Sequence, residues 1–189
     1  MIKIDEKKFE EIKKWAFLMN CVPFLRGSFV CNSYAMGTFD EKSDIDLFVV
    51  TKRNRLYTAR LFMNLLFRIF GIRTYGDDVA GKFCLSFFAD EDNLNFTSIA
   101  KKKDFYFAYW IYTLKPIIDQ KISDGISVSE KIVGRNFWAK DLLGFTDLEN
   151  LDRQTTLNKG VLEEEGVFSV TDKQKLQLDL TFAKNRFFF

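Results

Sequence analysis

Two aspartates one residue apart are the side chains in this sequence best suited to chemistry. They lie in the run Ser43-Asp44-Ile45-Asp46-Leu47-Phe48-Val49-Val50, whose apolar part is typical of a buried strand. Side chains alternate between the two faces of a strand, so we expect Asp44 and Asp46 on one face, about 6.6 Å apart along it. Two carboxylates that close repel each other unless a cation lies between them, and rigid carboxylate oxygens suit Mg²⁺. We therefore predict Asp44 and Asp46 as catalytic residues and as ligands of Mg²⁺ or Mn²⁺, the alternative being a solvated strand edge.

A turn with a small hydroxyl residue precedes the aspartates. It is Asn32-Ser33-Tyr34-Ala35-Met36-Gly37, and ten residues separate Ser33 from Asp44. Turn, spacing and strand together resemble the nucleotidyltransferase superfamily, which includes DNA polymerase beta and the small bacterial nucleotidyltransferases. In that family a Gly followed by Gly or Ser stands at this distance before an acidic–apolar–acidic–apolar run. Gly27-Ser28 matches the dipeptide, but 15 residues separate it from Asp44, so we assign the position to Ser33. Asn32 then replaces the family's Gly, and Asn tolerates left-handed backbone better than most residues.

The resemblance implies a reaction and a role for each of these residues. Asn32, Ser33 and Gly37 would bind the nucleotide, with Ser33 and nearby backbone N–H groups on the β- and γ-phosphates of an NTP. Asp44 and Asp46 would bind two Mg²⁺ ions, which activate an acceptor hydroxyl for attack on the α-phosphorus and release of pyrophosphate. The expected donor is ATP, and the acceptor is a small molecule, a protein or an RNA.

A third carboxylate is expected on a neighbouring strand in active members of the family. The natural strand here, 83–88, contains no acid, and Cys84 and Ser86 occupy its central positions. Asp90 and Asp92 are the candidate third acids, although a plain acidic turn explains them better. Two hypotheses therefore stand. The chain is either a nucleotidyltransferase, or a catalytically weak or inactive binding protein of that fold, antitoxin-like or regulatory. A structural module that binds through aromatic surface is a third alternative.

The composition excludes several other classes of chemistry. Histidine is absent, which excludes Ser-His-Asp and Cys-His catalysis and His-ligated zinc. The net charge of +2 does not indicate a dedicated nucleic-acid binder, and the three cysteines predict buried thiols. The longest charge-free apolar run around Trp110 is Phe105 to Leu114, short of the roughly 20 residues a membrane helix needs. With no evident signal peptide, we expect a soluble cytoplasmic protein without a membrane partner.

The periodicity of apolar residues predicts an α+β fold. The resemblance implies a small mixed β-sheet of the nucleotidyltransferase type with packed helices in residues 1–100, and we expect a helical region in residues 101–189 packed on it. Capping boxes at Thr146 and Thr171 predict further helix starts. The terminal Phe187-Phe188-Phe189 predicts docking on the core or on another chain, either a protein partner or a second copy. The expected helices are 6–20, 54–70, 101–118 and 129–143, and the expected strands are 28–32, 44–51, 82–88 and a short one at 93–97.

Overall fold

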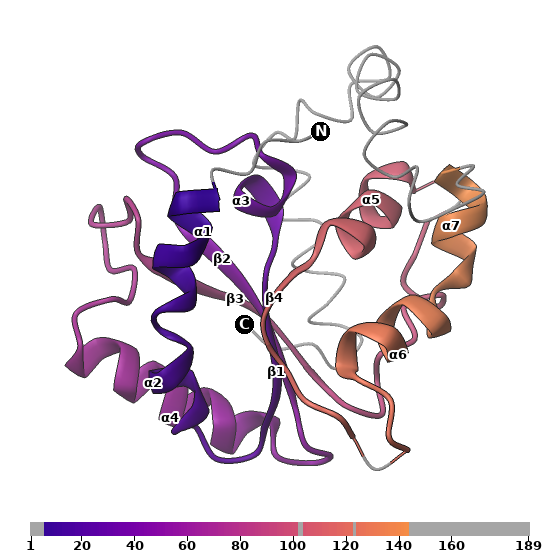
Figure 1. Ribbon diagram of the computed structural model, residues 1–189, viewed down its shortest axis with the longest axis horizontal. Helices are drawn as coiled ribbons and strands as arrows, with labels where there is room; N and C mark the ends of the chain where they lie inside the picture. The colour runs from indigo at the N-terminus through magenta and orange to yellow at the C-terminus, as the bar shows by residue number, and fades with distance from the viewer. Residues whose placement is uncertain (1–5, 102–103, 123, 144–189) are drawn as a thin grey trace.

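A four-stranded mixed sheet forms the centre of the molecule. The computed structural model describes residues 6–101, 104–122 and 124–143 (Figure 1). The order of the strands is β3-β2-β1-β4. β1 runs antiparallel to β2 and β4, whereas β2 and β3 are parallel. The strands are β1 (Leu25–Val30), β2 (Ile45–Thr51), β3 (Phe83–Asp90) and β4 (Lys115–Asp119). This arrangement, with several helices, confirms the predicted α+β class.

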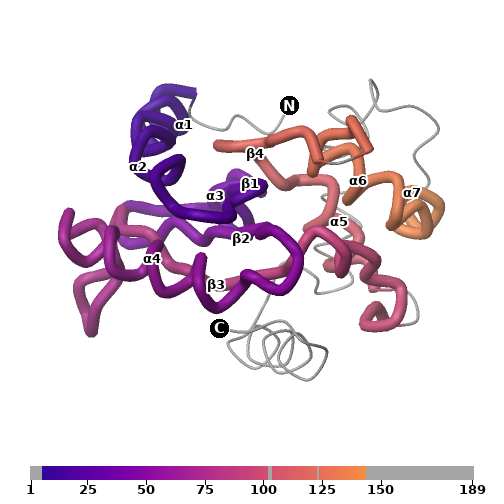
Figure 2. The backbone as a smooth tube through the Cα atoms, turned by 90° about the horizontal axis from the view of Figure 1, so that it is seen from below, coloured from indigo at the N-terminus to yellow at the C-terminus, as the bar shows by residue number. Residues whose placement is uncertain are grey.

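Helices cover both faces of the sheet, so the molecule has three layers (Figures 1 and 2). One face packs against α1, α2 and α4, and the other packs against α5, α6 and α7. The short helix α3 lies between β1 and β2 in the chain, at the end of the sheet where β2 begins. The helices are α1 (Glu6–Lys13), α2 (Ala16–Asn20), α3 (Asn32–Met36), α4 (Leu56–Ile69), α5 (Phe105–Thr113), α6 (Val128–Arg135) and α7 (Phe137–Leu143).

Strand β2 divides the apolar core into two clusters. All seven of its residues are buried, which is expected of a strand covered on both faces. Leu47 and Val49 belong to the cluster under α1, α2 and α4, while Phe48 and Val50 belong to the cluster under α5 to α7. Because Asp46 is two residues before Phe48, the alternation places it on the α5 side of the sheet.

The helix expected at 101–118 is wrong in its last five residues. The helix α5 ends at Thr113, and Lys115–Asp119 forms β4, which pairs with β1. Pro116 contributes to the change, because proline disfavours helical backbone in the residue before it, Lys115, and is tolerated in an edge strand. Leu114 already has extended ψ, at 125°. Because the apolar sequence continues from α5 to Leu114, it gave no sign that the helix ends there.

The short strand expected at 93–97 is also wrong, since no strand forms there. Leu94 and Phe96 are buried, but a side chain takes the place of a neighbouring strand. Asn136 donates to the Leu94 carbonyl oxygen and accepts from the Phe96 backbone N–H, both at 2.7 Å. The backbone of this segment is therefore satisfied without joining the sheet.

Other expected boundaries shift by a few residues. The expected helix 6–20 is two helices, α1 and α2, and 129–143 divides into α6 and α7 at Asn136. The first strand ends at Val30 rather than 32, because Asn32 already belongs to α3. The boundary at residue 100 stays a prediction, although the sheet takes β4 from beyond it. The features expected at Thr146, Thr171 and the terminal phenylalanines lie outside the described residues. No helix among those described is long and apolar enough to cross a membrane.

Candidate active site

Two carboxylates and a thiol converge where β2 and β3 begin. In the parallel register, Ile45 lies beside Phe83 and Asp46 lies beside Cys84. Asp44 immediately precedes β2, and ligand atoms of Asp44, Asp46 and Cys84 all lie within 4.8 Å of one another. Asp46 is only 2% exposed. The fold therefore brings the two aspartates close together, as the sequence predicted.

Asp46 lies in a buried chain of hydrogen bonds that joins four elements. Trp110 in α5 donates its indole Nε1–H to Asn32 Oδ1 at 3.0 Å. Asn32 in turn donates Nδ2–H to Asp46 Oδ2 at 2.9 Å, and the Ser86 hydroxyl in β3 donates to Asp46 Oδ1. Each oxygen of the carboxylate thus accepts a hydrogen bond from a neutral group. Such contacts hold a carboxylate in one orientation without neutralising its charge.

The turn before the aspartates is the short helix α3. Asn32 begins it with a positive φ of 54°, a conformation that Asn adopts more readily than most residues. Gly37 ends it with φ 71°, in the left-handed region that glycine enters at no steric cost. The Ser33 carbonyl accepts the backbone N–H groups of Gly37 and Thr38, which closes the turn. Asn32, Ser33 and Gly37 therefore belong to one compact element beside Asp46.

The electrostatics of the cluster favour a cation. Burial raises the pKa of the Cys84 thiol, and the negative charge of Asp46 raises it further. The pKa of Tyr34 is also raised, first by burial and then by the charges of Asp44 and Asp40. A divalent metal ion would offset this concentration of negative charge. Two carboxylates fit Mg²⁺ or Mn²⁺, which leave their other positions to water and phosphate oxygens, and a thiol is a poorer ligand for these hard ions.

Asp90 and Asp92, the candidate third acids, lie at the other end of the same two strands. Asp90 pairs with Thr51, five residues along β2 from Asp46, or about 16 Å at 3.3 Å per residue. Asp92 forms an ion pair with Arg53 at 3.2 Å. Neither aspartate is brought to the cluster. Ser86 and Cys84 are the β3 side chains next to Asp46, as the strand's sequence suggested.

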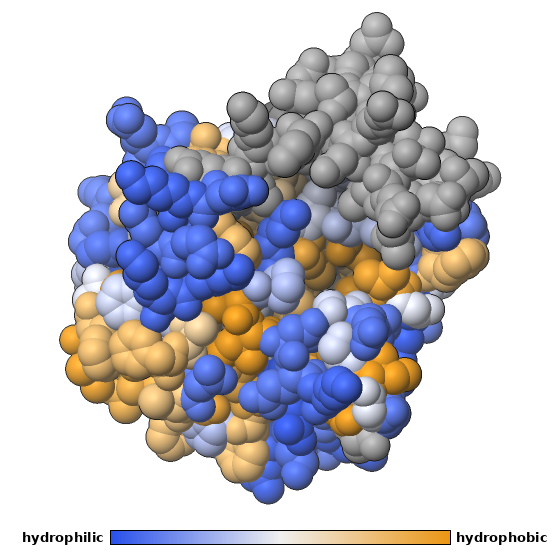
Figure 3. Space-filling view, in the orientation of Figure 1, coloured by the Kyte–Doolittle hydropathy of each residue, from blue (hydrophilic) through white to orange (hydrophobic). Residues whose placement is uncertain are grey.

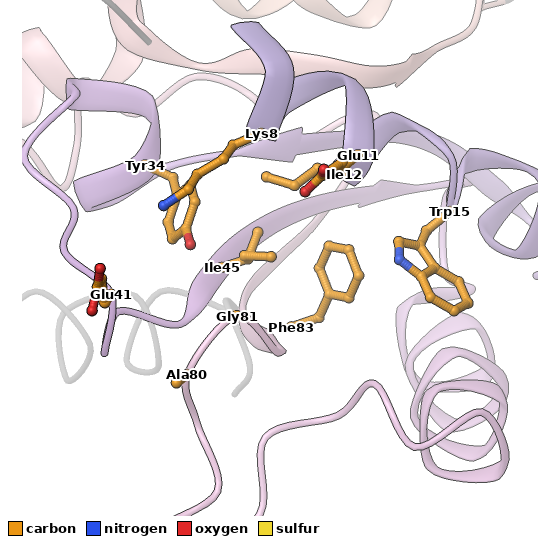
Figure 4. A pocket seen from close by; sticks show the side chains of 10 residues that line it. All are labelled: Lys8, Glu11, Ile12, Trp15, Tyr34, Glu41, Ile45, Ala80, Gly81 and Phe83. Carbon is orange, nitrogen blue, oxygen red and sulfur yellow. The ribbon is translucent and has the colours of Figure 1, made fainter. Parts of the chain in front are cut away.

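A pocket of about 400 Å³ lies on the opposite face of β2 from Asp46. Figure 4 shows Tyr34 and Ile12 facing Ile45 and Phe83 across it. Since Ile45 and Asp46 are consecutive in a strand, their side chains point to opposite faces. Tyr34 stacks on Phe39, with ring centroids 4.3 Å apart, and Glu41 from the loop that leads to Asp44 also lines the pocket.

Comparison with known families agrees with this geometry. The model of the family described as a nucleotidyltransferase domain matches residues 33–132, more than half of the chain. The chain belongs to that family. The match to the nucleotidyltransferase domain begins at Ser33 and extends into α6, so it includes the turn from Ser33 onward, both aspartates, β3 and α5. No curated protein and no solved structure matches the chain significantly.

Sequence reasoning about this nucleotidyltransferase domain missed the link between Asn32 and Trp110. Asn32 was expected to serve the nucleotide through its backbone, whereas its side chain lies 7% exposed between Asp46 and the indole. The aromatic segment around Trp110 reads as core, and it is core, with Trp110 fully buried. The one signal in the sequence was the replacement of the family's glycine by a residue with a hydrogen-bonding side chain.

Proposed function

We propose that this domain transfers a nucleoside monophosphate from an NTP, with ATP as the expected donor, to a hydroxyl acceptor. Asp44 and Asp46 hold the divalent metal, Mg²⁺ or Mn²⁺, and are the catalytic residues. The metal, when bound, neutralises phosphate charge and lowers the pKa of the attacking hydroxyl. The acceptor is a small molecule, a protein or an RNA.

The role of the α3 turn in this proposal is to hold the phosphates. The side chain of Ser33 is half-buried and supplies a hydroxyl donor, and its neighbour Asn32 contacts Asp46. Gly37 supports the same function indirectly, because it ends the turn where a side chain would strain the backbone. Asn32 orients Asp46 rather than contacting the nucleotide with its side chain.

One observation carries the proposal: the ligand atoms of Asp44, Asp46 and Cys84 meet within 4.8 Å, inside the segment matched to the nucleotidyltransferase domain. Carboxylates brought together in this way repel each other in the absence of a cation. The arrangement is therefore best explained as a metal site that faces the phosphates.

Thermal unfolding with and without nucleotide tests the proposal. We expect ATP with Mg²⁺ or Mn²⁺ to raise the melting temperature of the wild type, and ATP with EDTA to raise it less. Asp44→Asn and Asp46→Asn should lose the metal-dependent part of the shift. Absence of metal-dependent NTP binding in the wild type would refute the enzyme and the metal site together. Release of pyrophosphate on adding an acceptor would establish the transfer itself.

A nucleotide-binding protein without turnover is the second candidate, and β3 favours it. Ser86 and Cys84 stand beside Asp46 where active members of the family are expected to supply a third carboxylate. A domain of this kind would bind NTP and metal yet release no pyrophosphate with any acceptor. The variant Ser86→Asp separates the two candidates, because it restores an acid at that position and should create or increase turnover only if the rest of the site is competent.

A further inference from the structure

Helix α4 presents a row of large apolar side chains to solvent. Leu61, Leu65 and Ile69 are 66%, 53% and 68% exposed, and they recur every four residues. Phe62 and Phe70 flank the row and are 43% and 49% exposed. The opposite side of α4 is buried in the core through other residues, so this helix is apolar on both sides. Figure 3 shows apolar surface gathered at the lower left, where Figure 1 draws α2 and α4.

A second row along α4 is polar and cationic. Arg60, Asn64 and Arg68 repeat with the same four-residue spacing, and α4 contains no aspartate or glutamate. Among the described residues, no carboxylate forms an ion pair with Arg60, Arg68 or the nearby Arg73. Arg60 lies over the Phe88 ring at 5.3 Å and Arg68 over the Tyr75 ring at 5.9 Å. Burial and the charge of Arg73 lower the pKa of Arg60, as expected where cations gather without an anion.

We propose that this surface, the apolar row of α4 (Leu61, Leu65 and Ile69, with Phe62 and Phe70), binds an amphipathic α-helix of another protein that carries acidic residues along one edge. Side chains four residues apart form a ridge on a helix, and such ridges pack into the grooves of a second helix. A partner helix in that position places one edge beside Arg60 and Arg68, where carboxylates meet the cations. The proposal concerns a surface distinct from the candidate active site.

The charges distinguish this occupant from the alternatives. A second copy docked antiparallel through α4 would set arginine against arginine, and one docked parallel would set arginine against phenylalanine. Neither places a carboxylate beside the cations, because the helix has no acid to offer. An anionic lipid surface would favour cations on both sides of the apolar row, whereas here the side opposite Arg60 and Arg68 carries Phe62 and Phe70. A helix with one acidic edge matches both features.

Binding of three labelled synthetic helices to the full chain tests the proposal by fluorescence anisotropy. The first peptide has a leucine face and glutamates along one edge. The second has lysines in place of the glutamates, and the third keeps the glutamates and has glutamines in place of the leucines. We expect micromolar binding of the first and at least roughly tenfold weaker binding of the other two.

Variants of α4 make the test specific. Leu65→Ser should weaken binding of the first peptide roughly tenfold, since it removes an exposed apolar contact without touching the core. Arg68→Glu should weaken the first peptide and strengthen the second, because it reverses the charge at the edge. Phe137→Ser and Lys140→Glu provide matched controls on α7, where Phe137 is 58% exposed and Lys140 lies over its ring at 5.8 Å. These controls should leave binding unchanged.

Three results would overturn the proposal. One is equal binding of the acidic and lysine peptides, or no binding of either. Another is stronger attachment to phosphatidylserine vesicles than to the acidic peptide, with loss of that attachment in Leu65→Ser, which would identify a lipid surface. The third is a dimer in sedimentation equilibrium that Leu65→Ser dissociates, which would identify a second copy.

Discussion

The parallel pair β2 and β3 carries carboxylates at both of its ends, but their surroundings differ. At the end where the strands begin, Asp44 and Asp46 converge with Cys84, and Asp46 accepts hydrogen bonds from an amide and a hydroxyl. We call this the aspartate end. At the other end, Asp90, Glu91 and Asp92 follow one another in the chain, and we call this the arginine end.

At the arginine end each carboxylate is held by groups that belong to the fold. Arg26 binds Glu91 at 3.1 Å and Arg53 binds Asp92 at 3.2 Å, while Asp90 accepts the Asn93 side-chain amide at 2.7 Å. Charges paired in this way serve the structure. At the aspartate end, an amide and a hydroxyl orient Asp46, and its ligand atoms lie within 4.8 Å of those of Asp44 and Cys84. The difference teaches that proximity between acids indicates a metal site only when it is considered together with the groups that hold each carboxylate.

Metal binding should separate the two ends most strongly. Asp44→Asn should weaken Mn²⁺ binding in the presence of ATP by roughly 100-fold or more, because it removes a charged ligand. Asp90→Asn is the matched control at the arginine end, and binding should be unchanged. Isothermal titration calorimetry measures both. If Asp90→Asn weakened metal binding as much as Asp44→Asn, the proposal that metal binds at the aspartate end and not at the arginine end would be wrong.

Removing the support of Asp46 should have the next largest effect. Asn32→Gly and Trp110→Phe should each lower the free energy of unfolding by about 1–3 kcal/mol, because each leaves a buried polar partner without its hydrogen bond. Glycine adopts positive φ freely, so the stability lost in Asn32→Gly measures the contribution of the amide side chain and not a change in backbone strain. Urea unfolding measures both changes.

Because both variants break the same chain of hydrogen bonds, their effects should not add. The double variant is expected to be more stable than the sum of the two changes implies, by about 0.5–3 kcal/mol. Asn32→Gly combined with Arg26→Met, at the arginine end, is the control and should be additive within about 0.5 kcal/mol. Additivity of Asn32→Gly with Trp110→Phe would show that the indole does not act through Asn32.

The sequence predicted the aspartate end well because its signals are local. Alternation along 44–51 defines a strand, and the spacing of Ser33 from Asp44 lies within one turn and one loop. The same local signals failed for β4, because the apolar run of α5 continues into Leu114 without interruption. Pro116 was the sequence signal for the boundary between α5 and β4, because proline restricts the backbone of the residue before it.

What the sequence could not predict depends on contacts between distant residues. Trp110 reaches Asn32 across 78 positions, and Asn136 reaches Phe96 across 40. Neither periodicity nor a motif encodes such a partnership, because each depends on how two layers pack. Asp90 was considered a third acid because it follows the strand expected beside Asp46, on the same face as Ser86. The parallel register, with Asp46 beside Cys84, settles that point.

Breaking the more buried ion pair at the arginine end should lower the stability of the fold without affecting metal binding. The side chains of Arg26 and Glu91 are 29% and 13% exposed. Arg26→Met keeps most of the apolar stem and removes the charge, and it should lower the free energy of unfolding by about 1–2 kcal/mol. Calorimetric Mn²⁺ binding should be unchanged. A loss of metal binding in this variant would mean that the two ends are coupled through β2 and β3.

The smallest effect is expected for Arg53→Gln, which breaks the exposed pair with Asp92. Their side chains are 71% and 49% exposed, so water and salt screen the attraction, and the free energy of unfolding should fall by less than about 0.5 kcal/mol. The backbone N–H of Arg53 still donates to Glu91, because the substitution leaves the main chain intact. Near 1 M salt, where the screening length is about 3 Å, the difference from wild type in urea unfolding should vanish. A loss that persisted in high salt would mean that Arg53 acts through packing rather than charge, and that the arginine end is not held by ion pairs alone.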